Sequence, residues 1–184
     1  MKRIADIVIA LLGLPVALPL ILVCVVLVKW SSPGPAIFRQ TRVGLREQPF
    51  TCYKLRTMYI DTRDLPSHET AASAVTPTGR WLRRLKLDEL PQLWNILRGD
   101  MSFVGPRPCL PSQVELIKAR RARGLYAVRP GITGVAQVAG IDMSDPQRLA
   151  EIDAEYLSTI SLLTDLRLIL ATAFGAGRGD RVAS

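Results

Sequence analysis

Apolar positions are distributed unevenly along this chain, and the longest apolar run comes first. Residues 7–28 carry no charged side chain, and a straight helix of that length would extend about 33 Å, enough to cross a bilayer. Gly13, Pro15 and Pro19 lie in the middle of the run, where each proline removes a backbone hydrogen bond and bends a helix. Basic residues flank both ends, so charge favours neither orientation of a single crossing. A re-entrant helical hairpin with both ends in the cytoplasm and a kinked single span both fit this pattern.

Shorter apolar patterns over the rest of the chain predict a small hairpin followed by helices. Residues 36–40 and 50–58 have the pattern of short strands joined through a turn. Helices are predicted over residues 79–86, 89–98, 112–126 and 147–156. The apolar stretch 160–174 contains two charged residues and is too short to span a bilayer. It is either a core helix or a helix at a membrane interface.

Two polar stretches predict irregular structure. Residues 61–78 hold the only histidine, His68, and are expected to form a loop in which this side chain is solvated. Residues 175–184 are expected to form a disordered tail.

The stretch 87–108, LDELPQLWNILRGDMSFVGPRP, concentrates the candidate chemistry. Four of its apolar residues have the spacing of one helix face: Leu90, Leu93, Trp94 and Leu97. The pattern predicts a helix from about 89 to 98, with Asp88 as its N-cap and Gly99 just beyond its end. An aspartate at a helix start is most often only a cap, so the neighbouring residues decide how Asp88 is interpreted.

Those neighbours indicate chemistry on a phosphate ester. Glu89 adds a second carboxylate, which is the ligand type that Mg²⁺ prefers. Arg107 lies between two prolines that stiffen its loop, and its planar guanidinium suits phosphate oxygens. Lys54 and Arg56 are two residues apart on a predicted strand, so they share one face. That face is either a solvated edge or a phosphate-binding pair.

Composition narrows the class of partner. The 184 residues carry a formal net charge of +8, which favours an anionic partner: nucleic acid, a membrane surface or a phosphorylated substrate. The few aromatic residues do not alternate with basic ones as in single-strand binding proteins, so nucleic acid is not expected. The three cysteines form no CxxC pair, and neither zinc nor disulfides are predicted.

With these motifs placed, the chain resembles the bacterial sugar transferases of the monotopic phosphoglycosyl transferase superfamily, in their small single-domain form. The resemblance extends over nearly the whole chain. Its motifs are Lys2-Arg3-x-x-Asp6, the apolar segment broken by proline, Pro33-Gly34, Phe38-x-Gln40-x-Arg42-x-Gly44, Tyr53-Lys54-x-Arg56-Thr57-Met58, residues 87–108, residues 129–134 with Gln137, and Asp153-x-x-Tyr156. The chain departs from the family's pattern at four places. Leu18 stands where a serine is common, Lys86 where a small hydroxyl residue is usual, Val135 where an aromatic is usual, and Ala139-Gly140-Ile141 where Asn-Gly-Arg is usual.

The resemblance implies a reaction in which a sugar-1-phosphate passes from a UDP-sugar to polyprenol (undecaprenyl) phosphate, with release of UMP. This would be the first membrane step of glycoconjugate or exopolysaccharide synthesis. By resemblance, Asp88 is the aspartate that forms a covalent phosphosugar ester, Glu89 is its catalytic partner, and both are expected to hold Mg²⁺. The candidates for phosphate or substrate contacts are Arg107, Arg129, Lys54, Arg56, Arg83 and Gln137.

The predicted fold class is therefore α+β: a mainly helical, membrane-associated domain with a re-entrant N-terminal helical hairpin and a small β-hairpin. Residues 1–30 are expected to form the re-entrant membrane helix, and residues 31–174 a catalytic domain with interfacial helices. The expected location is the cytoplasmic face of a bacterial inner membrane, in contact with membrane lipids.

Two other functions fit parts of the sequence. A membrane-bound, Mg²⁺-dependent phosphohydrolase would use the same carboxylates with water as the nucleophile, and would need a base to activate that water. A non-enzymatic basic membrane protein would recruit anionic partners, but it would not need a proline-locked arginine beside two carboxylates.

Overall fold

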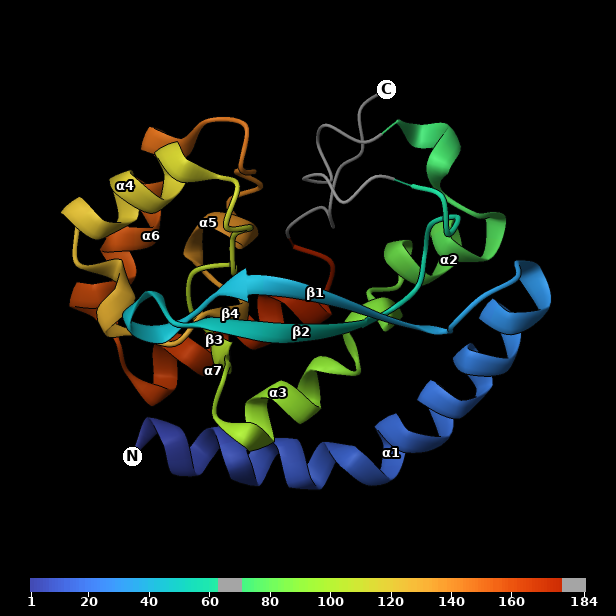
Figure 1. Ribbon diagram of the computed structural model, residues 1–184. Coiled ribbons are helices and arrows are strands. Elements are labelled where there is room, and N and C mark those ends of the chain that lie inside the picture. Colours follow the sequence, from blue (N-terminus) through green and yellow to red (C-terminus); the bar gives the residue numbers. More distant parts are fainter. Residues whose placement is uncertain (63–70, 177–184) are drawn as a thin grey trace.

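The computed structural model describes residues 1–62 and 71–176, and it shows a mixed α+β chain that is mostly helical (Figure 1). Its elements, in chain order, are α1 (Lys2–Ser31), β1 (Ile37–Val43), η1 (Leu45–Glu47), β2 (Pro49–Leu55), η3 (Ala72–Ala74), α2 (Pro77–Arg84), η4 (Leu87–Glu89), α3 (Gln92–Arg98), β3 (Ser102–Val104), α4 (Val114–Ala122), η5 (Leu125–Ala127), β4 (Gly131–Thr133), α5 (Val135–Val138), α6 (Pro146–Thr159) and α7 (Leu162–Ala173). The predicted class is confirmed at this level. His68 and residues 177–184 of the predicted tail lie outside the described residues.

The N-terminal segment is one helix of 30 residues that contains Pro15 and Pro19 and bends in its middle (Figure 1). It is a single bent helix, and the structure does not show two helices folded back on each other. Within the described part of the chain, α1 is the one helix whose length and composition would allow it to cross a membrane.

One face of α1 packs against the rest of the molecule along its whole length. The buried residues are spaced by four or seven positions and are mostly small: Asp6, Ala10, Ala17, Cys24 and Val28. The four apolar ones belong to two hydrophobic clusters that also contain residues of β2, α2 and α3. The opposite face is apolar and exposed, as at Leu12, Val16 and Leu22. The helix is therefore embedded in the body on one side, and it offers a continuous apolar surface on the other.

The N-terminal end of α1 is tied to α3 and β3. The guanidinium of Arg3 donates hydrogen bonds to the carbonyls of Ile96 and Leu97, at 2.6 and 3.1 Å. The carboxylate of Asp6 accepts from the hydroxyl of Ser102 at 3.0 Å and from the next backbone N–H at 3.2 Å. These contacts account for a buried charge at the start of an apolar helix, because a buried carboxylate is tolerated when it accepts hydrogen bonds.

The C-terminal end of α1 is tied to β2. The guanidinium of Arg56 donates to the carbonyl of Ser32 at 2.8 Å and also to that of Pro33. Cys24 and Val28 pack there against Leu55 at the end of β2. Both ends of α1 are thus held by the same folded body.

The two sheets are small. Strands β1 and β2 pair antiparallel, with Gln40 opposite Cys52, so the predicted hairpin is confirmed. The first strand is longer than the predicted 36–40, and the second is shorter than the predicted 50–58. Strands β3 and β4, of three residues each, pair in parallel, and the sequence pattern did not predict them. Their ends approach closely: a methyl group on Gly105 would collide with the carbonyl of Arg129, so glycine is needed at this crossing.

The helix predicted over 89–98 begins later than expected. Lys86 has a left-handed backbone (φ 57°) and is followed by the 3₁₀ turn η4, and α3 starts only at Gln92. The prediction that Asp88 caps this helix is wrong, because Asp88 lies inside η4 and Pro91 occupies the N-cap position. The predicted end is confirmed: Gly99 is the C-cap, with φ 96°.

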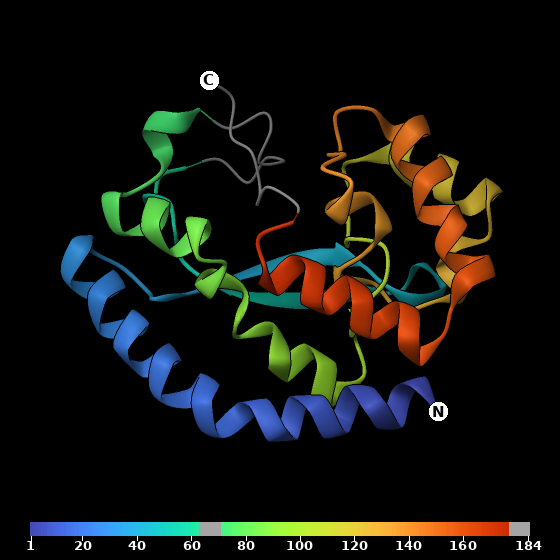
Figure 2. The same cartoon turned by 180° about the vertical axis from the view of Figure 1, so that it is seen from behind.

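Helix α7 lies across the hairpin on the side that faces the viewer in Figure 2. Asp165 points inward and accepts hydrogen bonds from Lys2 at 2.6 Å and from the hydroxyl of Tyr156 at 2.5 Å. Apolar side chains on its outer face are exposed, including Leu163 and Leu166. The helix therefore contributes polar groups to the interior and an apolar face to the surface.

Candidate active site

The centre of the site is a carboxylate held between two cations. Oε1 of Glu89, in η4, accepts from Nζ of Lys54 at 3.0 Å and from a guanidinium nitrogen of Arg107 at 2.6 Å. Lys54 comes from β2 and Arg107 from the loop after β3, and all three side chains are at most one-fifth exposed. The fold thus brings together residues that are 35 and 18 positions apart. The Coulomb attraction between charges that are partly shielded from water is stronger than between charges on an open surface.

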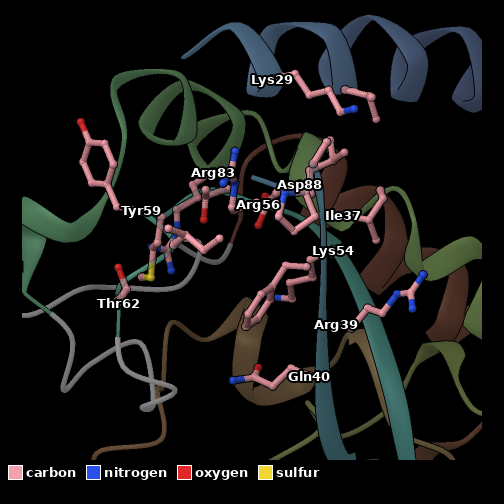
Figure 3. Close-up of a pocket in the computed structure, with 18 of the residues that line it drawn as sticks. Lys29, Ile37, Arg39, Gln40, Lys54, Arg56, Tyr59, Thr62, Arg83 and Asp88 are labelled. Carbon is pink, nitrogen blue, oxygen red and sulfur yellow. The ribbon is translucent and has the colours of Figure 1, made fainter. Parts of the chain in front are cut away.

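Asp88 lies beside this group and lines a cavity of about 800 Å³ (Figure 3). Only 6 % of the surface of Asp88 is exposed. Three of the predicted phosphate-binding residues line the same cavity: Lys54, Arg56 and Arg83. The η4 turn therefore directs one carboxylate, Asp88, into a cationic cavity, while its neighbour Glu89 pairs with cations.

The cavity also reaches α1 and an apolar wall. Val25 and Lys29, near the end of α1, line it together with Ile37 of β1 and Ile60. A cavity that combines cations, a carboxylate and an apolar side suits a ligand that has both a phosphate and a hydrocarbon part.

Two predicted site residues, Arg129 and Gln137, are not among the described residues that line this cavity. Nε of Arg129 donates to the carbonyl of Gly99 at 2.8 Å, at the end of α3 that lies away from η4. The side-chain amide of Gln137 is buried, and neither its nitrogen nor its oxygen has a hydrogen-bond partner among the described residues. An unpartnered buried amide costs about 1–3 kcal/mol, so Gln137 has the capacity to bind a further polar group.

Lys86, which precedes η4, connects this turn to α7. Its ammonium donates to the carbonyls of Thr172 and Ala176, at 3.2 and 2.9 Å, where α7 ends. Burial lowers the pKa of Lys86, with the nearby Glu89 opposing the shift and Arg107 adding to it. The hydroxyls of Thr172 and Thr133 also bond to each other, at 2.5 Å. The last turn of α7 thus contacts both the residue that precedes η4 and the end of β4.

Three residues support the site through contacts that sequence reasoning did not predict. Arg120 of α4 forms a buried ion pair with Asp153 of α6 at 2.6 Å, and Arg42 of β1 bonds to the loop that carries Arg107. Arg120 and Asp153 are 33 positions apart, so no local spacing could have revealed the pair.

Asp88 and Glu89 are the two adjacent carboxylates that would hold a metal ion. In the part of the chain that the structure describes, no cluster of three or more His, Cys, Asp or Glu side chains is placed to hold an ion. Mg²⁺, however, commonly uses only one or two carboxylates, and takes its other ligands from water and substrate phosphates. The residues present therefore fit a magnesium ion that arrives with a phosphorylated substrate.

Comparison with known proteins agrees with this chemistry. Residues 1–178 match the protein family described as "Bacterial sugar transferase". The chain is 44% identical over 181 residues to the UDP-glucose:undecaprenyl-phosphate glucose-1-phosphate transferase of Caulobacter vibrioides, covering 93% of this chain and 67% of that protein. It is 39% identical over 173 residues to the uncharacterized sugar transferase EpsL of Bacillus subtilis, covering 94% and 85%. It is 38% identical over 190 residues to the exopolysaccharide production protein ExoY of Sinorhizobium fredii, covering 93% and 83%.

Proposed function

The chain belongs to the bacterial sugar transferase family, and we propose that it transfers a sugar-1-phosphate from a UDP-sugar to undecaprenyl phosphate for exopolysaccharide or other glycoconjugate synthesis. Relatives with this printed activity, and one named for exopolysaccharide production, support the assignment. The observation that carries the proposal is the placement of Asp88 in a cationic cavity beside the Lys54–Glu89–Arg107 group.

In the first step, a carboxylate oxygen of Asp88 attacks the phosphorus that bears the sugar. A bond forms between this oxygen and phosphorus, and the bond from phosphorus to the bridging oxygen breaks. The bridging oxygen leaves with UMP, and Asp88 becomes an acyl phosphate that carries the sugar. Covalent catalysis of this kind divides one difficult transfer into two easier steps.

In the second step, a phosphate oxygen of undecaprenyl phosphate attacks the same phosphorus. The bond to Asp88 breaks, its carboxylate is regenerated, and the product is a polyprenol-diphosphate sugar. Lys54 and Arg107 neutralise the phosphate charge that develops in both steps, from positions that Glu89 already fixes. Arg56 and Arg83 extend this positive potential along the cavity, and Gln137 remains a candidate for a substrate contact.

Mg²⁺ is part of the proposal, with Asp88 and Glu89 as its protein ligands. When bound, the ion would neutralise charge on the diphosphate and on the departing UMP. Excess EDTA should therefore abolish UMP release, and added Mg²⁺ should restore it. Full activity in EDTA would remove the metal from this account.

The assignment is tested by incubating the purified protein in lipid nanodiscs with Mg²⁺, undecaprenyl phosphate and a panel of UDP-sugars that includes UDP-glucose. UMP should accumulate with at least one sugar, together with the lipid-linked product. With the acceptor omitted, one equivalent of UMP should form and mass spectrometry should find the phosphosugar on Asp88. Continuous release of free sugar-1-phosphate without acceptor would instead indicate a phosphohydrolase. No UMP release with any sugar would contradict the proposed function.

The proposed location is the cytoplasmic face of the bacterial inner membrane, with α1 entering and leaving on that face. Arg3 and Asp6 tie one end of α1 to α3 and β3, and Arg56 ties the other end to β2. A helix whose two ends are fixed to one folded body cannot cross the bilayer unless one set of contacts breaks. The exposed apolar face of α1 would then contact lipid within one leaflet.

The tryptophans support the same placement. All three project outward: Trp30 at the end of α1, Trp81 on α2 and Trp94 on α3, with 86%, 49% and 57% of their surface exposed. Tryptophan is enriched at membrane–water interfaces. With the outer face of α7, these residues give the enzyme an interfacial surface.

The topology is tested with a cysteine tag before Met1, in whole cells exposed to a membrane-impermeant thiol reagent. The tag should stay protected until the membrane is permeabilised. Replacing Pro15 and Pro19 by Ala should restore about two backbone hydrogen bonds and favour a straighter helix, so this variant should become at least partly reactive. Labelling of the unmodified chain in intact cells would contradict a re-entrant α1.

A further inference from the structure

The backbone of the loop that carries Arg107 is held at every carbonyl from residue 106 to residue 109. Each carbonyl accepts one hydrogen bond: Pro106 from the N–H of Gly131 at 2.9 Å, Arg107 from Arg120 at 2.7 Å, Pro108 from Arg42 at 3.0 Å, and Cys109 from the N–H of Val43 at 3.0 Å. The donors come from β4, α4 and β1. A loop that is fixed in this way loses little further freedom when its side chain binds a substrate.

The bond to the carbonyl of Arg107 depends on a buried ion pair. One nitrogen of the Arg120 guanidinium makes that bond, and another pairs with Asp153 at 2.6 Å. The two side chains are only 3% and 1% exposed. Asp153, on α6, therefore fixes the orientation of Arg120, and Arg120 in turn fixes the backbone from which Arg107 projects.

Stability alone does not explain this pair. Removing two charges from water costs several kcal/mol per ion, and well-packed apolar residues often stabilise a protein as much or more. Burial raises the pKa of the Asp153 carboxyl, and Arg120 only partly opposes that rise, so keeping the carboxyl ionised at neutral pH carries a folding cost. Nε of Arg120 is also buried without a hydrogen-bond partner among the described residues, which adds to this cost.

We propose that Arg120, oriented by Asp153, is a positioning residue for sugar-phosphate transfer. It holds the carbonyl of Arg107 so that the guanidinium of Arg107 meets Glu89 and the substrate's phosphate in one fixed geometry. Arg120 does not itself touch the reacting atoms. The inference rests on the proposed function, because it needs a transfer whose rate depends on Arg107.

The test compares Arg120→Lys with Arg121→Lys, its neighbour on α4. Arg121 forms an exposed ion pair with Glu47 and is the matched control. Lysine at position 120 keeps a charge opposite Asp153, but it lacks the fork that reaches two acceptors at once. Arg120→Lys should lower kcat for UMP release about tenfold, with KM changed less than threefold. Arg121→Lys should match the unmodified enzyme, and thermal unfolding followed by circular dichroism establishes that each variant is folded.

A double-mutant cycle with Arg107→Ala separates positioning from a general loss of structure. If Arg120 acts through Arg107, then Arg120→Lys should change kcat less than twofold once Arg107 is alanine. An equal tenfold loss in both backgrounds would overturn the proposal, as would an unchanged kcat in Arg120→Lys alone. If Arg120→Lys does not fold, Asp153→Asn, which keeps the shape and one acceptor, takes its place in the same cycle with the same expected outcomes. A failure of the proposed function would differ, because the unmodified enzyme would then release no UMP.

Discussion

The two ends of α3 place arginines in opposite kinds of surroundings. Just before the helix begins, Arg107 meets the carboxylate of Glu89 next to the cavity that holds Asp88. At its end, Arg3 and Arg129 meet backbone carbonyls of the last helical turn and of Gly99. Cations near a helix C-terminus are favourable, since they satisfy the last carbonyls and oppose the negative end of the dipole.

We infer from this difference that Arg107 binds substrate, whereas Arg129 stabilises the fold. A carboxylate beside an open cavity can share its cations with an incoming phosphate. A helix carbonyl is part of the backbone, and its arginine ties one element to another. Arg107 and Arg129 each precede a proline, so their local sequences are alike, and only the partner of each guanidinium distinguishes them.

The largest effect should come from the proposed nucleophile, Asp88, in the turn η4 that precedes α3. Asp88→Asn keeps the size of the side chain but removes the attacking carboxylate, so turnover should fall by several orders of magnitude while the fold survives. UMP release measures the rate, circular dichroism measures the fold, and mass spectrometry should find no phosphosugar adduct on the variant. Near-normal turnover would exclude the covalent mechanism.

A smaller loss is expected from Arg107→Lys. The charge beside Glu89 remains, but the planar fork that fits a phosphate is lost. We expect a cost of roughly 1–3 kcal/mol in transition-state stabilisation, or about 5- to 150-fold in kcat/KM. If kcat/KM equals that of the unmodified enzyme, Arg107 contributes only charge.

The smallest effect on activity should come from the same substitution, arginine to lysine, at the C-terminal end of α3. Arg129→Lys weakens the bond to the carbonyl of Gly99, so the unfolding midpoint should fall slightly, by the equivalent of about 0.5–1.5 kcal/mol. Its kcat/KM should stay within about threefold of the unmodified enzyme. A loss as large as that of Arg107→Lys would remove the contrast between the two ends, and would support the prediction that Arg129 contacts substrate.

Much of the fold could be predicted from the sequence, because the patterns that indicate it are local. The long apolar helix, the hairpin and the glycine that ends α3 all follow from residue type and spacing within a few positions. The start of α3 was misplaced because Lys86 adopts a left-handed backbone, which is uncommon for a residue other than glycine and has no marker in the sequence. Strands β3 and β4 are too short for any alternation to be recognised.

The candidate site could be predicted only in part from the sequence. Asp88, Glu89 and Arg107 come from one continuous motif, and Lys54 was a separate candidate on a predicted strand. Only the structure shows that Lys54 and Arg107 both pair with Glu89. No pattern within the chain pairs Arg120 with Asp153 or directs Arg129 to the end of α3, since these contacts exist only once the chain has folded. Residue types and spacing can therefore identify the reacting groups more readily than the groups that hold them in place.

The outward position of all three tryptophans determines what the intrinsic fluorescence of this protein can report. About half or more of each tryptophan is already exposed in the folded state, so its emission should change less on unfolding than that of a buried tryptophan. Transfer of Trp30, Trp81 or Trp94 from water to lipid should instead shift the emission to shorter wavelengths. The unlabelled protein thus carries its own optical probe of bilayer binding, and titration with vesicles should reveal partitioning that a denaturation curve followed at the same wavelength would miss.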